Sequence, residues 1–157
     1  MEKQLLQRGP TEGRWIAQSG DLNRFLAVSE NTGGAYAQWE AIVPPGGGPR
    51  LHVHSREDES FYVLEGEVQF LINGVPYAAS AGTYVSLPAG SSHRFRNEST
   101  SVARLLITVT PGGLEGLFFE AGIQVAPGTA VAPRPTKDEK EKIRAAAPRY
   151  GITLLPE

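Results

Sequence analysis

The stretch "GGGPRLHVHSREDESFYVLEG", residues 46–66, decides the fold because it combines possible metal ligands with strand and turn signals. It holds two of the three histidines of the chain, His52 and His54, with one residue between them. On a β-strand alternate side chains share a face, so both imidazoles would point the same way while Leu51 and Val53 face the other side. Such a pair favours two ligands for one metal ion, and it needs support from other residues.

A carboxylate follows the histidine pair at the start of the next apolar segment. Glu59 precedes "SFYVLEG", and an acid at the mouth of a buried strand is costly unless solvent, a partner or a cation stabilises its charge. Glu57 has the same parity and competes with it, whereas Asp58 should point away. The spacing therefore favours Glu59 as a third ligand and leaves Glu57 as the alternative.

The third histidine lies in "GTYVSLPAGSSHRFRN", residues 82–97. His93 follows a proline-glycine turn and begins a strand in which Phe95 and Asn97 share the histidine's face. Arg94 and Arg96 would then point outward. Taken alone, His93 would be a structural residue bonded to the backbone, so its meaning depends on the other two histidines.

Short apolar runs separated by Gly, Pro, Asn and Ser continue from about residue 14 to residue 109, which predicts strands and turns. Many short strands with no helical pattern between them favour an antiparallel barrel or sandwich, so the fold class is all-β. Asn73-Gly74 is a strong hairpin signal, and Glu65-Gly66 is a second tight reversal. The expected strands are 14–16, 25–28, 36–43, 51–55, 60–65, 67–72, 75–79, 84–87, 93–97 and 103–110.

The chain changes character after Pro111. The segment "GGLEGLFFEAG" predicts a short helix, and a proline-spaced connector follows it. Thr136 can cap a further helix over about 137–147, Glu139 would complete a capping box, and Pro148 should end the helix. We therefore expect N-terminal strands in 1–33, a core barrel in 34–112 and a C-terminal extension in 113–157.

The composition of the chain excludes several classes of site and partner. The 157 residues suit one domain, and the absence of cysteine excludes disulfides, thiolate metal ligands and thiol nucleophiles. The formal net charge of -2 lacks the basic field that nucleic acids attract. The amino terminus "MEKQLLQRGP" has no apolar run of the secretion type, and no stretch is long enough to cross a bilayer. We expect a soluble, cytoplasmic protein without nucleic-acid or membrane partners.

Both histidine segments resemble the two signature motifs of the cupin family. The first motif, G-x5-H-x-H-x4-E-x6-G, and the second, G-x5-P-x-G-x2-H-x3-N, are present without a gap. The only departure is Thr83, where the second motif often carries an acid. The matched positions are Gly46, His52, His54, Glu59, Gly66, Gly82, Pro88, Gly90, His93 and Asn97.

The resemblance implies a small antiparallel barrel of the jelly-roll type, with one divalent metal held by His52, His54, Glu59 and His93. Imidazole and carboxylate ligands suit Fe, Mn, Co, Ni, Cu or Zn, and ligand type does not choose among them. The flanks and the tail "RYGITLLP" look like the single-domain cupins grouped with quercetin 2,3-dioxygenase. An octahedral ion would leave two adjacent sites for an enolate-type substrate and dioxygen or water.

This likeness predicts a dioxygenase acting on a flavonol-like or other enolisable small molecule, with Glu59 as ligand and general base. A non-catalytic module that binds a small ligand, and an isomerase or lyase, are the alternatives. Arg50 shares the parity of His52 and could hold an anionic substrate. Apolar residues at strand spacing could form the pocket wall, namely Phe61, Val63, Phe70, Phe95 and Ile107.

Single-domain cupins also resemble one another in forming two-fold dimers. An open sheet around 36–43 would expose unpaired backbone groups, which favours pairing with a second copy. Trp15, Ile16, Phe25 and Leu26 could be lent across that interface, or they could complete the sheet of their own chain. The sequence thus predicts a homodimer and leaves both uses of the N-terminal strands open.

Overall fold

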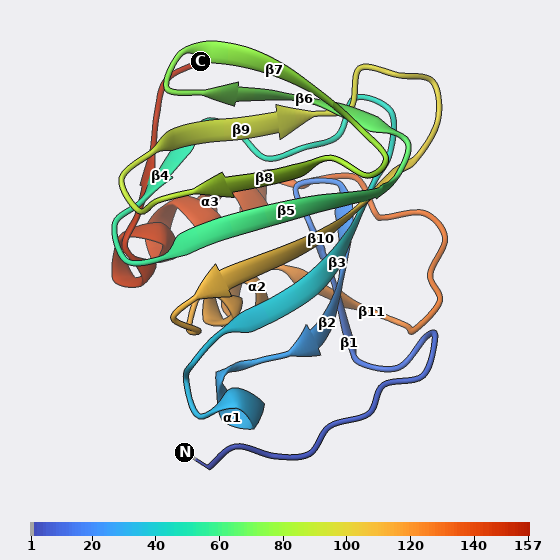
Figure 1. Cartoon of the computed structure of the whole chain (residues 1–157), viewed down its shortest axis with the longest axis vertical. Helices are drawn as coiled ribbons and strands as arrows, with labels where there is room; N and C mark the ends of the chain where they lie inside the picture. Colours follow the sequence, from blue (N-terminus) through green and yellow to red (C-terminus); the bar gives the residue numbers. More distant parts are fainter. Residues whose placement is uncertain (1) are drawn as a thin grey trace.

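Two antiparallel β-sheets face each other in the computed structural model, which describes residues 2–157 (Figure 1). The seven-stranded sheet has the order β11 (Ile123–Val125), β1 (Arg14–Gln18), β2 (Asp21–Ala27), β3 (Ala37–Val43), β10 (Ala103–Thr110), β5 (Asp58–Glu65) and β8 (Tyr84–Leu87). The five-stranded sheet has the order β12 (Ile152–Leu154), β4 (His52–His54), β9 (Ser92–Arg96), β6 (Glu67–Ile72) and β7 (Val75–Ser80). The helical elements are α1 (Ser29–Thr32), α2 (Glu115–Ala121), α3 (Lys137–Ala146) and the 3-10 turn η1 (Ala147–Tyr150).

The all-β prediction is confirmed, and the expected barrel takes the form of a jelly roll whose two sheets do not join into a closed ring. The turn at Glu65-Gly66 leads from one sheet to the other. It does not make a hairpin, because β5 belongs to the seven-stranded sheet and β6 to the five-stranded one. The Asn73-Gly74 turn does make a hairpin between β6 and β7, and both residues have the positive φ angles that such a turn requires.

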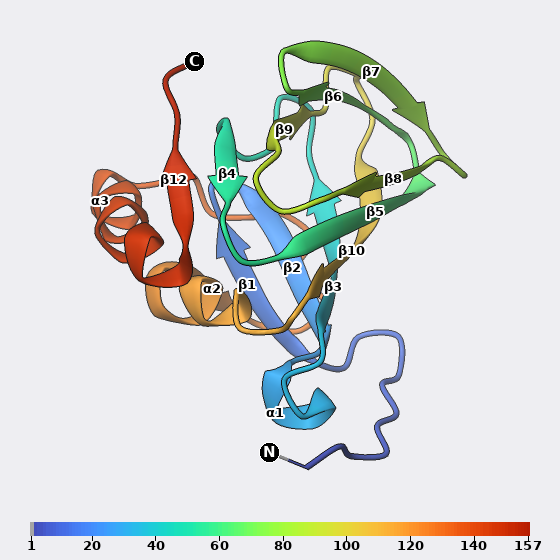
Figure 2. The ribbon, with the colours of Figure 1, turned by 60° about the vertical axis from the view of Figure 1, so that its left-hand side comes forward.

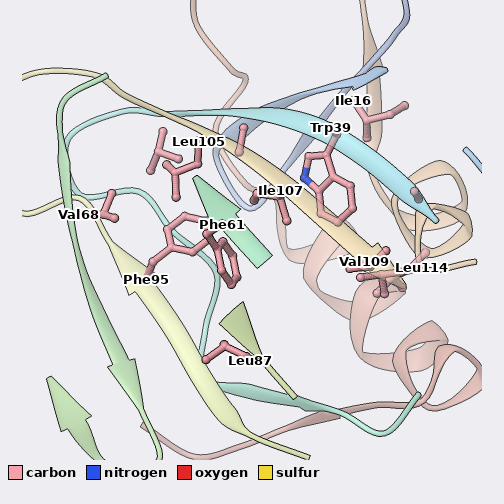
Figure 3. Close-up of a cluster of buried hydrophobic side chains, with 14 of the residues drawn as sticks. Ile16, Trp39, Phe61, Val68, Leu87, Phe95, Leu105, Ile107, Val109 and Leu114 are labelled. Carbon is pink, nitrogen blue, oxygen red and sulfur yellow. The ribbon is translucent and has the colours of Figure 1, made fainter. Parts of the chain in front are cut away.

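The core lies between the sheets and follows the period-two pattern of the strands. On β10 the inward residues Ala103, Leu105, Ile107 and Val109 are all buried, while their neighbours are not. Figure 3 shows Phe61, Phe95, Leu105 and Ile107 gathered in this interior. Burial of apolar area here is the main favourable term for folding, at roughly 25 cal/mol per Å².

The N-terminal strands complete the sheet of their own chain. β1 pairs with β2 and β11, and β2 pairs with β3, so β3 is an interior strand flanked by β2 and β10. The expected open edge at residues 36–43 was therefore wrong. Trp15, Ile16 and Phe25 are buried within the chain, which matches the second use predicted for them. The homodimer stays a prediction that no longer has an exposed β3 edge to support it.

The C-terminal extension folds back onto the five-stranded sheet. α3 ends at Ala146, one residue before the predicted end, and leads through η1 into β12, a strand that the sequence did not predict. β12 pairs with β4 and runs between β4 and α3 (Figure 2). Thr136 caps α3 as predicted, but Glu139 does not complete a capping box. Its carboxylate accepts from the Ser19 amide at 2.8 Å instead.

No helix within residues 2–157 combines the length and the apolar character that a membrane crossing needs.

Candidate metal centre

The four predicted ligands converge from three strands of the two sheets. β4 supplies His52 and His54, and its neighbour β9 places His93 directly opposite His52 in the ladder. Glu59 reaches the same point from β5 in the facing sheet. The potential ligand atoms of these four residues all lie within 4.8 Å of one another. The period-two alternation of the strands, which sets both imidazoles of β4 on the inner face, therefore holds in the structure.

The donor atoms lie at contact distance from one another. The two Nε2 atoms of His52 and His54 are 3.0 Å apart. Glu59 Oε2 lies 3.1 Å from Nε2 of His54 and 2.9 Å from Nε2 of His93. Two donors bound at right angles to one ion, each about 2.1 Å away, are about 3.0 Å apart. The spacing of the cluster is thus the spacing of adjacent ligands on one transition-metal ion.

Contacts on the far side of each ring fix the tautomers. His52 Nδ1 lies 2.7 Å from the Arg50 carbonyl oxygen, and His93 Nδ1 lies 3.0 Å from the Ser91 carbonyl oxygen. A carbonyl only accepts, so each Nδ1 must carry the proton and donate it. In the neutral rings Nε2 then presents a lone pair to the centre. This is the arrangement by which outer partners orient histidine ligands.

Glu57 performs the corresponding role for His54. The carboxylate is buried, and its Oε2 lies 3.4 Å from His54 Nδ1, outside the group of four donors. Neither atom makes a hydrogen bond within residues 2–157, so the contact between them is a close ion pair without hydrogen-bond geometry. The sequence identified Glu57 as a competitor for the metal because of its parity. Its position makes it a residue that orients His54, and β5 begins only after it, which the spacing alone could not reveal.

Protonation in the cluster follows from burial and mutual contact. Burial, with the charges of His93 and His54, lowers the pKa of His52 to about 3. Burial opposes charge on His54 as well, but Glu59 and Glu57 outweigh it and raise the pKa of His54 to about 9. Burial would raise the pKa of Glu59, yet the charges and hydrogen bonds of His54 and His93 hold it well below its ordinary value. A cation between carboxylate and imidazole is therefore what stabilises the centre, and a metal ion can take the place of the proton.

The donor chemistry fits a divalent transition metal. Three oriented imidazole nitrogens and a carboxylate oxygen meet at contact distance in a buried place, and none of them is a thiolate. Without a cation, lone pairs of Nε2 and Oε2 would face one another in a region of low dielectric, at a cost of several kcal/mol. His52, His54, Glu59 and His93 would hold the ion.

Two further residues secure the strands that carry the ligands, and one of them, Asn97, is a motif position. Asn97 is completely buried, and its side-chain amide donates to the carbonyls of Val43 and Ser101. Gly48 has φ +123°, and a Cβ there would lie 2.0 Å from the Phe95 carbonyl oxygen. A larger residue at position 48 would thus displace β9, the strand of His93. Neither residue touches the centre, and both position it.

The centre opens into a cavity of about 520 Å³ between the sheets. Arg50, Phe61, Phe95 and Ile107 line it, as the sequence predicted. Val63 and Phe70 do not, because both are packed in the apolar core away from this wall. The sequence-based prediction included every inward residue of a strand, whereas only the inward residues close to the four donors reach the cavity.

The C-terminal extension supplies a second wall that the sequence did not reveal. From α3 and β12 the cavity is lined by Lys140, Ile143, Arg144, Ile152 and Leu154. Arg96 also lines it, although strand alternation predicted an outward side chain; it is half-buried and donates to the Gly48 carbonyl. The sequence predicts α3 as a helix, but it does not predict which face of α3 lines the cavity.

Comparison with known proteins agrees with this architecture. The family model for the cupin domain matches residues 39–109, which include all four donors. Quercetin 2,3-dioxygenase of Bacillus subtilis is 27% identical over 111 residues, 71% of this chain, and the match covers 33% of that protein. Protein SchB of Streptomyces halstedii is 30% identical over 96 residues, 60% of this chain and 68% of that protein.

The fold has counterparts among solved structures. The crystal structure of a predicted oxalate decarboxylase from Thermotoga maritima superposes with a TM-score of 0.62 at 23% identity, covering 68% of this chain and 99% of that one. The likeness extends to the fold alone at that identity, and the chain spans only a third of the length of the Bacillus dioxygenase. The family match, the similarity to protein SchB and the two motifs together show that the chain belongs to the cupin superfamily.

Proposed function

We propose that the protein is a metal-dependent dioxygenase that acts on a flavonol-like or other enolisable small molecule. The observation that carries the proposal is the four-donor centre in a cavity with an apolar wall of Phe61, Phe95 and Ile107 and room for a small organic molecule. The similarity to the Bacillus quercetin 2,3-dioxygenase supports this reaction over other cupin activities. When bound, the metal would supply Lewis acidity toward a substrate hydroxyl and a route to dioxygen.

Residues of the chain would accept the substrate proton and exclude water. Glu59 Oε2 contacts the imidazoles, while Glu59 Oε1 has no hydrogen-bond partner in residues 2–157 and is the oxygen that would accept a hydroxyl proton from the substrate. The contacts with His54 and His93 hold the pKa of Glu59 well below its ordinary value, so the carboxylate is ionised but a weak base. It would therefore take the proton of a hydroxyl that the bound metal acidifies. Phe61, Phe95 and Ile107 would pack against the substrate and exclude water from the reacting end.

The test combines metal content with oxygen uptake. The purified protein is analysed for metals, loaded with each of the six candidate ions in turn, and supplied with a flavonol or a diketone in an oxygen-electrode cell. Oxygen uptake with cleavage of the compound supports the proposal. Turnover of the compound without oxygen uptake would replace it with an isomerase or lyase, and binding without turnover would replace it with a ligand-binding module.

Glu59→Gln separates the two roles of the carboxylate. An amide oxygen can still coordinate weakly but cannot take a proton at neutral pH. We expect oxygen uptake to fall by about 100-fold or more while metal content falls less. Unchanged turnover in this variant would remove Glu59 as the base.

A further inference from the structure

The charged side chains of α3 fall into two groups according to their partners. Lys137 lies 3.9 Å from Glu141, and Lys142 lies 3.1 Å from Asp138, in each case one helical turn apart. None of these four residues lines the cavity. They form two exposed ion pairs on the side of the helix that faces away from the site.

Lys140 and Arg144 form the second group. They are four residues apart and so lie on one face of the helix, where both line the cavity together with Ile143. Within residues 2–157 neither has a carboxylate oxygen within 4.0 Å, in contrast to the lysines of the outer pairs. A helix that pairs its outer lysines and leaves its inward cations unpaired presents positive charge to whatever occupies the cavity.

Other charges of the cavity do not cancel these two. Glu59 is engaged by the imidazoles, and Glu157 lies 3.5 Å from the Arg96 guanidinium. Burial raises the pKa of Asp21 to about 7, so this carboxyl is largely uncharged below neutral pH. Arg50 donates only to the Leu155 carbonyl, which leaves its charge unneutralised as well. The cavity is therefore cationic although the whole chain has a net charge of -2.

We propose that Lys140 and Arg144 select substrates that carry an anionic oxygen group, a carboxylate or a phosphate, at the end away from the four-donor centre. The proposal deepens the proposed function and rests on it only for the orientation of the enolisable end. A guanidinium binds two oxygens of such a group at once, and a lysine one turn away supplies a further donor. Both side chains line the cavity and are also exposed to solvent, so salt would partly screen these contacts.

Matched ligands test the proposal by binding rather than by turnover. The probes are a flavonol with a carboxylate on its phenyl ring, the methyl ester of that acid, and the phosphate monoester of the same scaffold. Their affinities for the metal-loaded and metal-free protein are measured by calorimetry. We expect both anions to bind about tenfold or more tightly than the ester, and the preference to shrink when salt rises from about 0.05 to 0.5 M. The ratio of carboxylate to phosphate affinity identifies which group the site prefers.

Variants of the same helix supply the control. The Lys140→Ala/Arg144→Ala protein should lose most of its preference for the acid over the ester, whereas the Lys137→Ala/Lys142→Ala protein loses the same charge and should keep the full preference. Equal binding of acid and ester by the wild type, including no measurable binding of either, would overturn the proposal. So would a preference that survives in the Lys140→Ala/Arg144→Ala protein. Anion preference without oxygen uptake would refute the dioxygenase reaction and support the anion site.

Discussion

The two sheets hold their shape in different ways. The seven-stranded sheet has a mostly apolar inner face that is interrupted by Asn23 and Glu59. Phe25 on β2 packs against Trp39, Phe118 and Phe119 at ring separations of 5.0–5.4 Å. In the five-stranded sheet β4 has only three residues, and two of them are the buried or half-buried histidines of the centre. Apolar burial stabilises the first sheet. The second depends near β4 on polar contacts, a neighbouring tail strand and the charge between the sheets.

The difference gives the metal a structural role beside its chemical one. Three donors belong to the five-stranded sheet and Glu59 to the seven-stranded sheet, so one ion would tie the sheets together at the end where apolar packing is interrupted. Binding to the folded chain alone raises its stability by mass action. The following variants test how far the two sheets differ.

Phe25→Ala should give the largest loss of stability, about 3–5 kcal/mol, because it empties a fully packed aromatic site. Tyr77→Ala on β7 should cost less than about 1 kcal/mol, since that ring is 51% exposed. Urea unfolding of both variants measures the two values. Similar costs would mean that the sheets do not differ in the way proposed.

His93→Ala should weaken metal binding at least about 100-fold, since the loss of residues that merely orient ligands already costs about 10–100-fold. The matched control is Ser92→Ala, whose half-buried side chain is on the other face of β9. Elemental analysis after dialysis gives the metal content. In addition, the melting temperature of the wild type should rise on metal addition and that of His93→Ala should not. Full metal retention by the variant would contradict the convergence of the two motifs.

Asp21→Asn should change how stability depends on pH. The folded-state pKa of about 7 lies above the ordinary value of 3.8, so between these two pH values the folded chain binds more protons than the unfolded one. The free energy of unfolding therefore falls as pH rises through this window, and the variant should lack that part of the fall. We expect it to gain on the order of 4 kcal/mol over the wild type between pH 4 and pH 8. Parallel pH profiles from urea unfolding would refute the burial effect, and Asp138→Asn on the exposed face of α3 is the control.

Thr153→Pro should weaken metal binding by about tenfold without unfolding the protein. The amides of Ser55 and Leu155 donate across the β4–β12 ladder, and the alternation of antiparallel bonds places the Thr153 amide toward Val53. Proline removes that donor, so the strand of His52 and His54 loses a fixed neighbour. Thr153→Val keeps the amide and should bind metal like the wild type. Unchanged affinity in the proline variant would show that β4 needs no support from the tail.

Much of the site was predictable because it is encoded by short-range periodicity. The two-residue repeat placed His52 and His54 on one face. It also set His93 and Phe95 inward on β9 and Asn97 inward just after it, and all three are buried. The hairpin at Asn73-Gly74 follows from residues that tolerate positive φ. Such features depend on neighbours within a few residues, and the chain alone determines them.

Contacts between distant segments were decided only by the tertiary structure. β12 was not predicted because "ITL" is too short to signal a strand, and it forms only where β4 offers a free edge. The path of the loop before β5 brings Glu57 next to His54. The packing of α3 places Lys140 and Arg144 in the wall of the cavity. The sequence by itself determined the four candidate donors and most of the strands. The sheet order, the C-terminal wall and the charge around the cavity depend on long-range packing, whose free energy is shared among many residues and leaves no local pattern.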